Sequence, residues 1–373
     1  MKVLLLFTYK NSLQSWFESG ILNREIKIYK KLNEIYDIEF IFLTYGDEAD
    51  HEYVKEYSFI QVIPLYEHLI KKKSQVLDLL NVAKSLKKLL NKYNLNFQII
   101  KTNQLNGVWI GFLLKKLLKK PLIVRTGYDM YLFSLKEKKS KLKQIFYYLL
   151  TWSALLYSDI YTVSSENDYQ YIKNHYLFPK TKVLLRRNWV EVSKIKDFKY
   201  RSSNSILSVG RLEIQKDFEY LINKFNNIKR YELHIVGTGS QAEYLKKISS
   251  KNILFFDKLE NSILMDLYEN YKFYISSTDY EGNPKSIIEA MSKGCIVIAP
   301  NNENILEIIE HGFNGFIYDK SSLNLDSLLE NFSNLNIEEI SKNSYNFIKN
   351  HYSIENAIKL EYQDYKKFTD EIL

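Results

Sequence analysis

A glutamate in a turn, followed by a helix that begins at a proline, stands out in residues 276–300, which read SSTDYEGNPKSIIEAMSKGCIVIAP. Asn283 as N-cap and Pro284 in the first turn are residue types that open helices. The first backbone N–H groups of such a helix have no partner within it, and here they belong to Lys285, Ser286 and Ile287. These N–H groups suit an anion, while the carboxylate of Glu281 suits hydroxyl groups. The stretch therefore predicts a site for a sugar joined to a diphosphate.

Glu289 lies in the same predicted helix, near its second turn. Its neighbours Ile288 and Ala290 predict a largely buried helix, which argues against the alternative, a solvated surface glutamate. Gly294 is the expected end of the helix before an apolar strand. Glu289 is therefore a second candidate for contact with a ligand.

A second loop offers cationic groups. Gly210 and Arg211 follow an apolar run, and Lys216 comes five residues after Arg211. A glycine after a strand lets the backbone approach a ligand, and an arginine with a lysine provides donors for a diphosphate. The alternative is two ordinary surface cations on a basic chain.

Gly237 and Gly239 begin a G-x-G-x-x-A pattern after a strand, which is a permissive form of the dinucleotide fingerprint. Asp257 follows at about the distance expected of a ribose-binding acid. However, the pattern follows the second strand of the second predicted domain, whereas the fingerprint belongs after the first. We therefore favour a glycine turn beside a ligand phosphate and keep an NAD-dependent oxidoreductase as an alternative.

Metal ligands and catalytic nucleophiles give no comparable pattern. The six histidines show no H-x-x-x-H spacing, the sequence has no D-x-D pair, and no G-x-S-x-G occurs. We expect arginine, lysine and backbone N–H groups to neutralise phosphate, with no metal and no resident cofactor.

Short apolar runs alternate with helical patterns along the chain, which predicts parallel, doubly wound sheets. The periodicity lapses over residues 193–205, so we expect an α/β protein with two Rossmann-like domains, at 1–195 and 196–352, and a last helix within 353–373. A chain of 373 residues is long enough for both. The expected strands are 3–7, 40–44, 60–63, 97–101, 122–125, 160–163, 206–209, 232–236, 253–256, 273–276 and 295–299.

The composition is that of an ordinary globular protein, with 46% hydrophobic and 26% charged residues and a formal charge of +8. Its single cysteine excludes a disulfide framework and indicates a reducing, cytoplasmic setting. The first apolar run is too short for a signal peptide, and residues 145–157 are too few to span a bilayer. The lysine runs, such as 115–120 and 136–143, are interpreted as solvated helix faces, with attachment to anionic lipid as the alternative; they form no nucleic-acid module.

Four motifs together resemble the GT-B glycosyltransferases of family 4, and softer upstream matches resemble relatives that build surface polysaccharides. The motifs are V-G-R-L-x-x-x-K-D-F at 209–218, V-G-x-G at 236–239, S-x-x-x-E-G-N-P-K-S-I-I-E-A-M-x-x-G at 277–294 and E-H-G-x-N-G-F at 310–316. The resemblance implies two domains facing a cleft, a last helix crossing back to the first domain, and metal-independent transfer with retention. The implied partners are a nucleotide-sugar donor and a glycan or lipid-linked acceptor, with the enzyme at the inner face of the membrane.

Carried over by position, the resemblance assigns a role to each candidate. Arg211 and Lys216 would hold the donor diphosphate, and the N–H groups of Ser286 and Ile287 would complete that cradle. Glu281 would contact the sugar hydroxyls and Glu289 the ribose. The nucleotide pocket would be lined by Gly237 and Gly239, with Gly210, Asn283, Pro284 and Lys285 beside the donor.

One position departs from the family. Relatives carry a histidine in a cleft loop of the first domain, where this chain reads Gly127-Tyr128-Asp129. Asp129 is the expected polar substitute there. The alternatives within the fold are an epimerase or a phosphorylase; outside it they are the NAD enzyme and a non-catalytic nucleotide-sugar binder.

Overall fold

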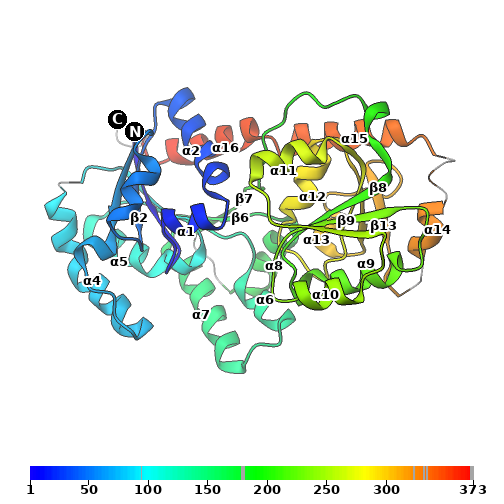
Figure 1. Cartoon of the computed structure of the whole chain (residues 1–373). Coiled ribbons are helices and arrows are strands. Elements are labelled where there is room, and N and C mark those ends of the chain that lie inside the picture. The colour runs from blue at the N-terminus through cyan, green and yellow to red at the C-terminus, as the bar shows by residue number, and fades with distance from the viewer. Residues whose placement is uncertain (94, 178–180, 322–323, 331, 333–334, 370–373) are drawn as a thin grey trace. The chain divides into compact units, whose positions relative to one another are not determined.

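The computed structural model describes the whole chain except residues 94, 178–180, 322–323, 331, 333–334 and 370–373. Its internal contacts divide the chain into two compact units (Figure 1). Unit 1 consists of Met1–Ser164, Asp168–Arg186 and Ile358–Leu373, and unit 2 consists of Ser165–Asn167 and Arg187–Ala357. Each unit is built on one parallel sheet, as the alternating pattern predicts.

The sheet of unit 1 has the order β3-β2-β1-β4-β5-β6-β7. Its central strand is buried from Val3 to Leu6 because helices cover both faces of a parallel sheet. The strands are β1 Lys2–Leu6, β2 Glu39–Thr44, β3 Ile60–Pro64, β4 Ile99–Thr102, β5 Leu122–Arg125, β6 Ile160–Val163 and β7 Lys182–Leu185. The expected strand at 97–101 therefore begins two residues later, and β7 was not expected.

The helices of unit 1 alternate with these strands. They are α1 Leu13–Glu18, α2 Leu22–Tyr36, α3 Leu65–His68, α4 Gln75–Lys92, α5 Val108–Leu118, α6 Met130–Lys136, α7 Lys141–Tyr157 and α8 Glu166–His175, the start of which counts with unit 2. Short 3₁₀ turns add η1 Glu48–Val54 and η2 Leu105–Gly107.

Helix α1 follows β1 closely and is not among the elements that the sequence pattern predicted. Ser12 and Ser15 form a reciprocal capping box, in which each side chain accepts the other's backbone N–H at 2.9–3.0 Å. Trp16 is buried and stacks on Phe7, with ring centroids 4.3 Å apart. Cap and aromatic contact stabilise an element too short for its periodicity to show.

The sheet of unit 2 has the order β10-β9-β8-β11-β12-β13. Its strands are β8 Ser202–Val209, β9 Glu232–Val236, β10 Ile253–Phe256, β11 Tyr271–Ile275, β12 Ile296–Pro300 and β13 Gly315–Tyr318. Its helical elements are α9 Phe218–Phe225, α10 Ala242–Ile248, α11 Asn261–Tyr268, α12 Lys285–Ser292, α13 Glu303–Leu306, α14 Asn324–Glu330, α15 Ile337–His351, η3 Phe198–Tyr200 and η4 Ile214–Lys216. The edge strand β13 was not expected, since four residues after a glycine turn give little pattern.

The last helix, α16, runs from Ile354 to Lys366 and counts with unit 1 from Ile358 onward. There Asp364 accepts two hydrogen bonds from the Arg186 guanidinium, at 2.6 and 2.7 Å. Tyr362 stacks on Tyr36 with ring centroids 4.0 Å apart. Residues 370–373 of the expected helix lie outside the described residues.

Cys295 lies at the entrance to β12 with no exposed surface. Burial raises the pKa of its thiol to about 12. Within the part of the chain that the structure describes, no helix combines the length and apolar character that a membrane span requires.

Candidate functional site

All strands of the unit 2 sheet are parallel, and the order in which they are added switches sides between β8 and β11. From β8, strand order runs outward through β9 and β10 on one side and through β11, β12 and β13 on the other. Ligands of such sheets bind where the loops at the carboxyl ends of the two central strands part. The loop after β8 contains Lys216 and the loop after β11 contains Glu281. The topology therefore brings together candidates that lie far apart in the sequence.

Lys216 and Glu281 form an ion pair between these two loops. Their side chains are 19% and 13% exposed, so the pair is largely shielded yet open to a ligand. Gln215 also links the loops: its side-chain amide donates to Tyr280 O at 2.8 Å, and its backbone carbonyl accepts from Asp279 N at 3.0 Å. The hydroxyl of Ser277 donates to Lys216 O at 2.8 Å. The position of both charged groups is thus set by backbone contacts.

Asn304 of α13 holds the acidic turn from the other side. Its amide nitrogen donates to Glu281 O and to Gly282 O, both at 2.6 Å. Lys320 contributes a second bridge, with ion pairs to Asp217 at 2.5 Å and Asp279 at 2.6 Å. Sequence reasoning missed Gln215, Asn304 and Lys320 because none of them belongs to a recognisable catalytic or binding motif.

Two of the three candidate glycines, Gly237 and Gly239, are required by close packing of the loops after β8 and β9. A Cβ atom on Gly237, where φ is +148°, would lie 1.9 Å from Gly210 O. One on Gly239 would lie 2.4 Å from Leu212 O. Gly210 itself leaves ordinary van der Waals room, with Phe218 at 3.4 Å and Lys216 at 3.8 Å. Steric packing alone therefore explains the G-x-G pattern, whether or not a nucleotide lies beside it.

The start of α12 differs from the expected capping. Pro284 itself is the N-cap, no side chain caps the helix, and Asn283 lies one residue before it. The N–H group of Ile287, expected to be available to a phosphate, donates to Pro284 O at 3.1 Å. Of the three N–H groups expected to bind an anion, that of Ile287 is therefore engaged within the protein.

Glu289 is buried on α12, as its apolar neighbours predict, with only 7% of its surface exposed. One carboxylate oxygen accepts from the Asn261 amide of α11 at 3.2 Å. A buried carboxylate held in this way is oriented in advance for a hydroxyl partner.

Arg211 is exposed, and among the described residues its side chain has no hydrogen bond or ion pair. Its charge lowers the pKa of Glu213, although the largest cause of that shift is the Ser240 hydroxyl, which donates to Glu213 at 2.6 Å. The guanidinium is therefore free to reorient toward an anion.

Asp129 belongs to unit 1 and does not offer its carboxylate to a ligand in this structure. It has no exposed surface. It is the N-cap of α6, accepting from Leu132 N at 2.7 Å and from the Tyr176 hydroxyl at 3.0 Å. Burial raises the pKa of this carboxyl group. In this structure the Asp129 carboxylate serves as a helix cap, and its expected role toward a ligand stays a prediction.

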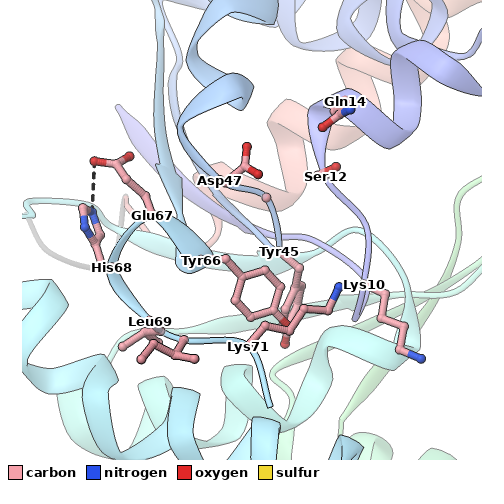
Figure 2. Close-up of a pocket in the computed structure, with 12 residues that line it drawn as sticks. Lys10, Ser12, Gln14, Tyr45, Asp47, Tyr66, Glu67, His68, Leu69 and Lys71 are labelled. Atoms are coloured by element: carbon pink, nitrogen blue, oxygen red, sulfur yellow. Dashed lines mark ion pairs between the residues drawn. The ribbon is translucent and has the colours of Figure 1, made fainter. Parts of the chain in front are cut away.

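Unit 1 has a polar pocket of about 630 Å³ at the carboxyl ends of β1, β2 and β3 (Figure 2). The ammonium group of Lys71 lies 5.2 Å from the ring centroid of Tyr66, and the side chains of Glu67 and His68 approach to 3.7 Å. The lining comprises Lys10, Ser12, Gln14, Tyr45, Gly46, Asp47, Tyr66, Glu67, His68, Leu69, Ile70 and Lys71. Aromatic faces beside many hydrogen-bonding groups suit a carbohydrate. No sequence motif pointed to this pocket.

Comparison with known proteins gives related sequences. Residues 191–356 match the family described as Glycosyl transferases group 1. An uncharacterized glycosyltransferase of Methanocaldococcus jannaschii is 24% identical over 355 residues, covering 87% of this chain and 86% of the relative. The O-antigen biosynthesis glycosyltransferase WbnH of Escherichia coli is 27% identical over 228 residues, covering 59% of this chain and 65% of the relative.

Solved structures share the whole architecture. A sucrose-phosphate synthase of Thermosynechococcus elongatus superposes with a TM-score of 0.78 at 15% identity, covering 100% of both chains. Anabaena HepE in complex with UDP-glucose superposes with a TM-score of 0.70 at 16% identity, covering 98% of this chain and 100% of that one. At such identities the superpositions establish a shared fold.

Proposed function

We propose that the chain, which has the GT-B fold, is a glycosyltransferase that moves a sugar from a nucleoside-diphosphate sugar to a glycan or lipid-linked glycan. The proposal includes family 4 chemistry: retention of anomeric configuration without a metal, in cytoplasmic synthesis of surface polysaccharide. The observation that carries it is the contact between Lys216 and Glu281 at the point where the strand order of the unit 2 sheet switches sides, between β8 and β11.

Charge separation in the transferred bond explains the cationic side of this site. When the bond between sugar and phosphate breaks, negative charge grows on the leaving diphosphate. Lys216 is fixed by its neighbours, Arg211 is exposed, and the positive end of the α12 dipole follows the turn that carries Glu281. These donors stabilise the leaving group in the role that a metal ion has in other enzymes.

The two glutamates serve different hydroxyl groups in this proposal. In the proposal Lys216 contacts both Glu281 and the diphosphate. The Glu281 carboxylate is then close to the donor sugar and accepts hydrogen bonds from its hydroxyl groups. Glu289 lies farther along α12, where the Asn261 amide donates to it, and in the proposal it accepts hydrogen bonds from the ribose hydroxyl groups. The superposed HepE, which was solved with UDP-glucose, supports a nucleotide-sugar donor.

The polar pocket of unit 1 is the proposed place for the acceptor. It offers tyrosine rings for sugar faces and lysine, serine and glutamine side chains for hydroxyl or acidic groups. The similarity to an O-antigen biosynthesis enzyme supports a polysaccharide acceptor.

Donor binding tests the proposal directly. UDP or GDP should raise the melting temperature of the protein, whereas NAD should not. Lys216→Ala should reduce this shift by lowering nucleotide affinity roughly tenfold or more, the scale of a charge-assisted contact. Lys272→Ala is the matched control, because Lys272 lies near the opposite end of β11. Equal loss in both variants, or a shift with NAD alone, would refute the assignment.

Transfer itself is tested with the preferred donor and a glycan acceptor. Glu281→Gln should lower the turnover by on the order of 10²-fold while nucleotide binding persists. Chelation of divalent ions should leave turnover unchanged. Product formed without an acceptor alcohol would favour the epimerase or phosphorylase alternative.

A further inference from the structure

Helix α7 carries apolar side chains on two sides, and the core of unit 1 uses only one of them. Leu150, Ala154 and Leu155 are buried in that core. On the other side, exposed apolar residues recur at helical spacing, which places them in one stripe. The stripe consists of Leu142, Ile145, Phe146, Leu149 and Trp152.

An aromatic groove continues the stripe beside α5. Its volume is about 1120 Å³, and its lining includes Trp109, Phe112 and Tyr157. The ring of Trp109 lies 6.0 Å from that of Phe146, and the ring of Phe112 lies 5.5 Å from that of Tyr157, measured between centroids. Groove and stripe therefore form one apolar surface of unit 1.

Lysines border this surface at both ends. Residues 115–120, at the end of α5, read KKLLKK, and residues 136–143, which lead into α7, read KEKKSKLK. Lys115 pairs with Asp159 and Lys139 with Glu137. Within the described residues no ion pair engages the remaining exposed lysines Lys116, Lys119, Lys136, Lys138, Lys141 and Lys143. The border therefore carries excess positive charge.

We propose that this apolar stripe and groove, with their lysine border, dock unit 1 on an anionic lipid bilayer. Protein interfaces are depleted of lysine, whereas an anionic bilayer accepts apolar and aromatic side chains below its head groups and attracts lysines at its surface. The first half of α7 extends beyond the sheet of unit 1, as docking on a flat surface requires (Figure 1). The inference rests on the proposed function and extends it, because a lipid-linked acceptor lies in such a bilayer.

Vesicle flotation tests the proposal with the full chain. The protein should float with phosphatidylcholine vesicles that contain phosphatidylglycerol, float less at high salt, and float little with phosphatidylcholine alone. Ile145→Glu should lower the partition coefficient at least tenfold. Replacing both Lys141 and Lys143 by alanine should lower it roughly fivefold per lysine. Unchanged flotation of these variants, or no binding of the natural protein, would overturn the proposal.

A matched control separates this surface from general hydrophobicity. Ile35 of α2 is 57% exposed and Ile145 is 56% exposed, while Figure 1 shows α2 and α7 at opposite ends of unit 1. Ile35→Glu should float like the natural protein, and both variants should melt at its temperature because both sites are exposed. Sedimentation as a dimer that Ile145→Glu alone abolishes, with flotation intact, would instead assign the surface to a second copy.

Failure of this inference is distinguishable from failure of the proposed function. The UDP and GDP thermal shifts of unit 2 are measured on the same preparations. A protein that binds nucleotide but not anionic vesicles refutes the docking surface alone. A protein that binds vesicles but no nucleotide refutes the donor site and leaves the docking surface standing.

Discussion

Gly237→Ala tests whether the G-x-G pattern is a steric requirement of the fold. The added methyl group would lie 1.9 Å from Gly210 O, which is backbone and cannot swing aside. In addition, the φ of +148° is one that residues with a Cβ rarely adopt. Backbone strain costs about 1–3 kcal/mol and overpacking costs about the same. We therefore expect a loss of about 4 kcal/mol from the stability of unit 2.

Two further glycines separate these contributions. Gly312 has a φ of +79° but no atom within 4 Å of an added Cβ, so Gly312→Ala should cost about 1 kcal/mol from strain alone. Gly239→Ala brings a clash at 2.4 Å with Leu212 O, without a left-handed φ, and should fall between the two. The order of stability should be Gly312→Ala, then Gly239→Ala, then Gly237→Ala.

Differential scanning calorimetry provides the measurement. At about 2–4 °C per kcal/mol for a domain of this size, Gly237→Ala should lower the transition of unit 2 by roughly 8–16 °C. A transition of unit 1 that stays in place is the internal control. If Gly237→Ala melts like Gly312→Ala but no longer binds nucleotide, the glycine serves the ligand and the steric reasoning is refuted.

Three smaller changes probe other contacts. Asn304→Ala removes both amide contacts to the turn at Glu281 and should lower transfer about tenfold with a stability loss of about 1–2 kcal/mol by urea unfolding; full activity would contradict the positioning role. Ser12→Ala breaks the capping box of α1 and should cost about 1 kcal/mol, while an unchanged denaturation midpoint would show that Trp16 alone holds the helix. Burial raises the pKa of Asp129 above its ordinary 3.8, so its contribution to stability is complete below that value and is lost as the pH rises through the folded-state pKa. Asp129→Asn keeps an acceptor for Leu132 N and should flatten urea-unfolding stability over that pH range; an unaltered pH dependence would count against this.

Periodic patterns predicted the sheets well, because strands buried on both faces are nearly continuous apolar runs. Leu122–Arg125 and Ile160–Val163 have the expected bounds. Short elements were missed where tertiary contacts decide: α1 depends on Trp16 meeting Phe7, and β13 on pairing with β12. Such contacts leave no periodic signal in the sequence.

In the candidate site, too, the residue types could be predicted from the sequence, whereas the contacts between loops could not. The motif around Glu281 and the cations after β8 could be chosen by chemistry, and the sheet order explains why they meet. The direct pairing of Lys216 with Glu281 could not be predicted, since it depends on loop geometry. For Asp129 the sequence did not reveal the local role: the residue precedes a helix and is its N-cap, while its role toward a ligand stays a prediction.

The buried thiol of Cys295 makes the protein convenient for probe chemistry. It is the only cysteine of the chain, it has no exposed surface, and its raised pKa keeps it protonated at neutral pH. Maleimides and methanethiosulfonates should therefore not react with Cys295 in the folded protein, and should label only a cysteine that is introduced at an exposed position. A nitroxide or an environment-sensitive dye at position 145, compared with one at position 35, can then report depth and polarity without any need to remove a native residue first.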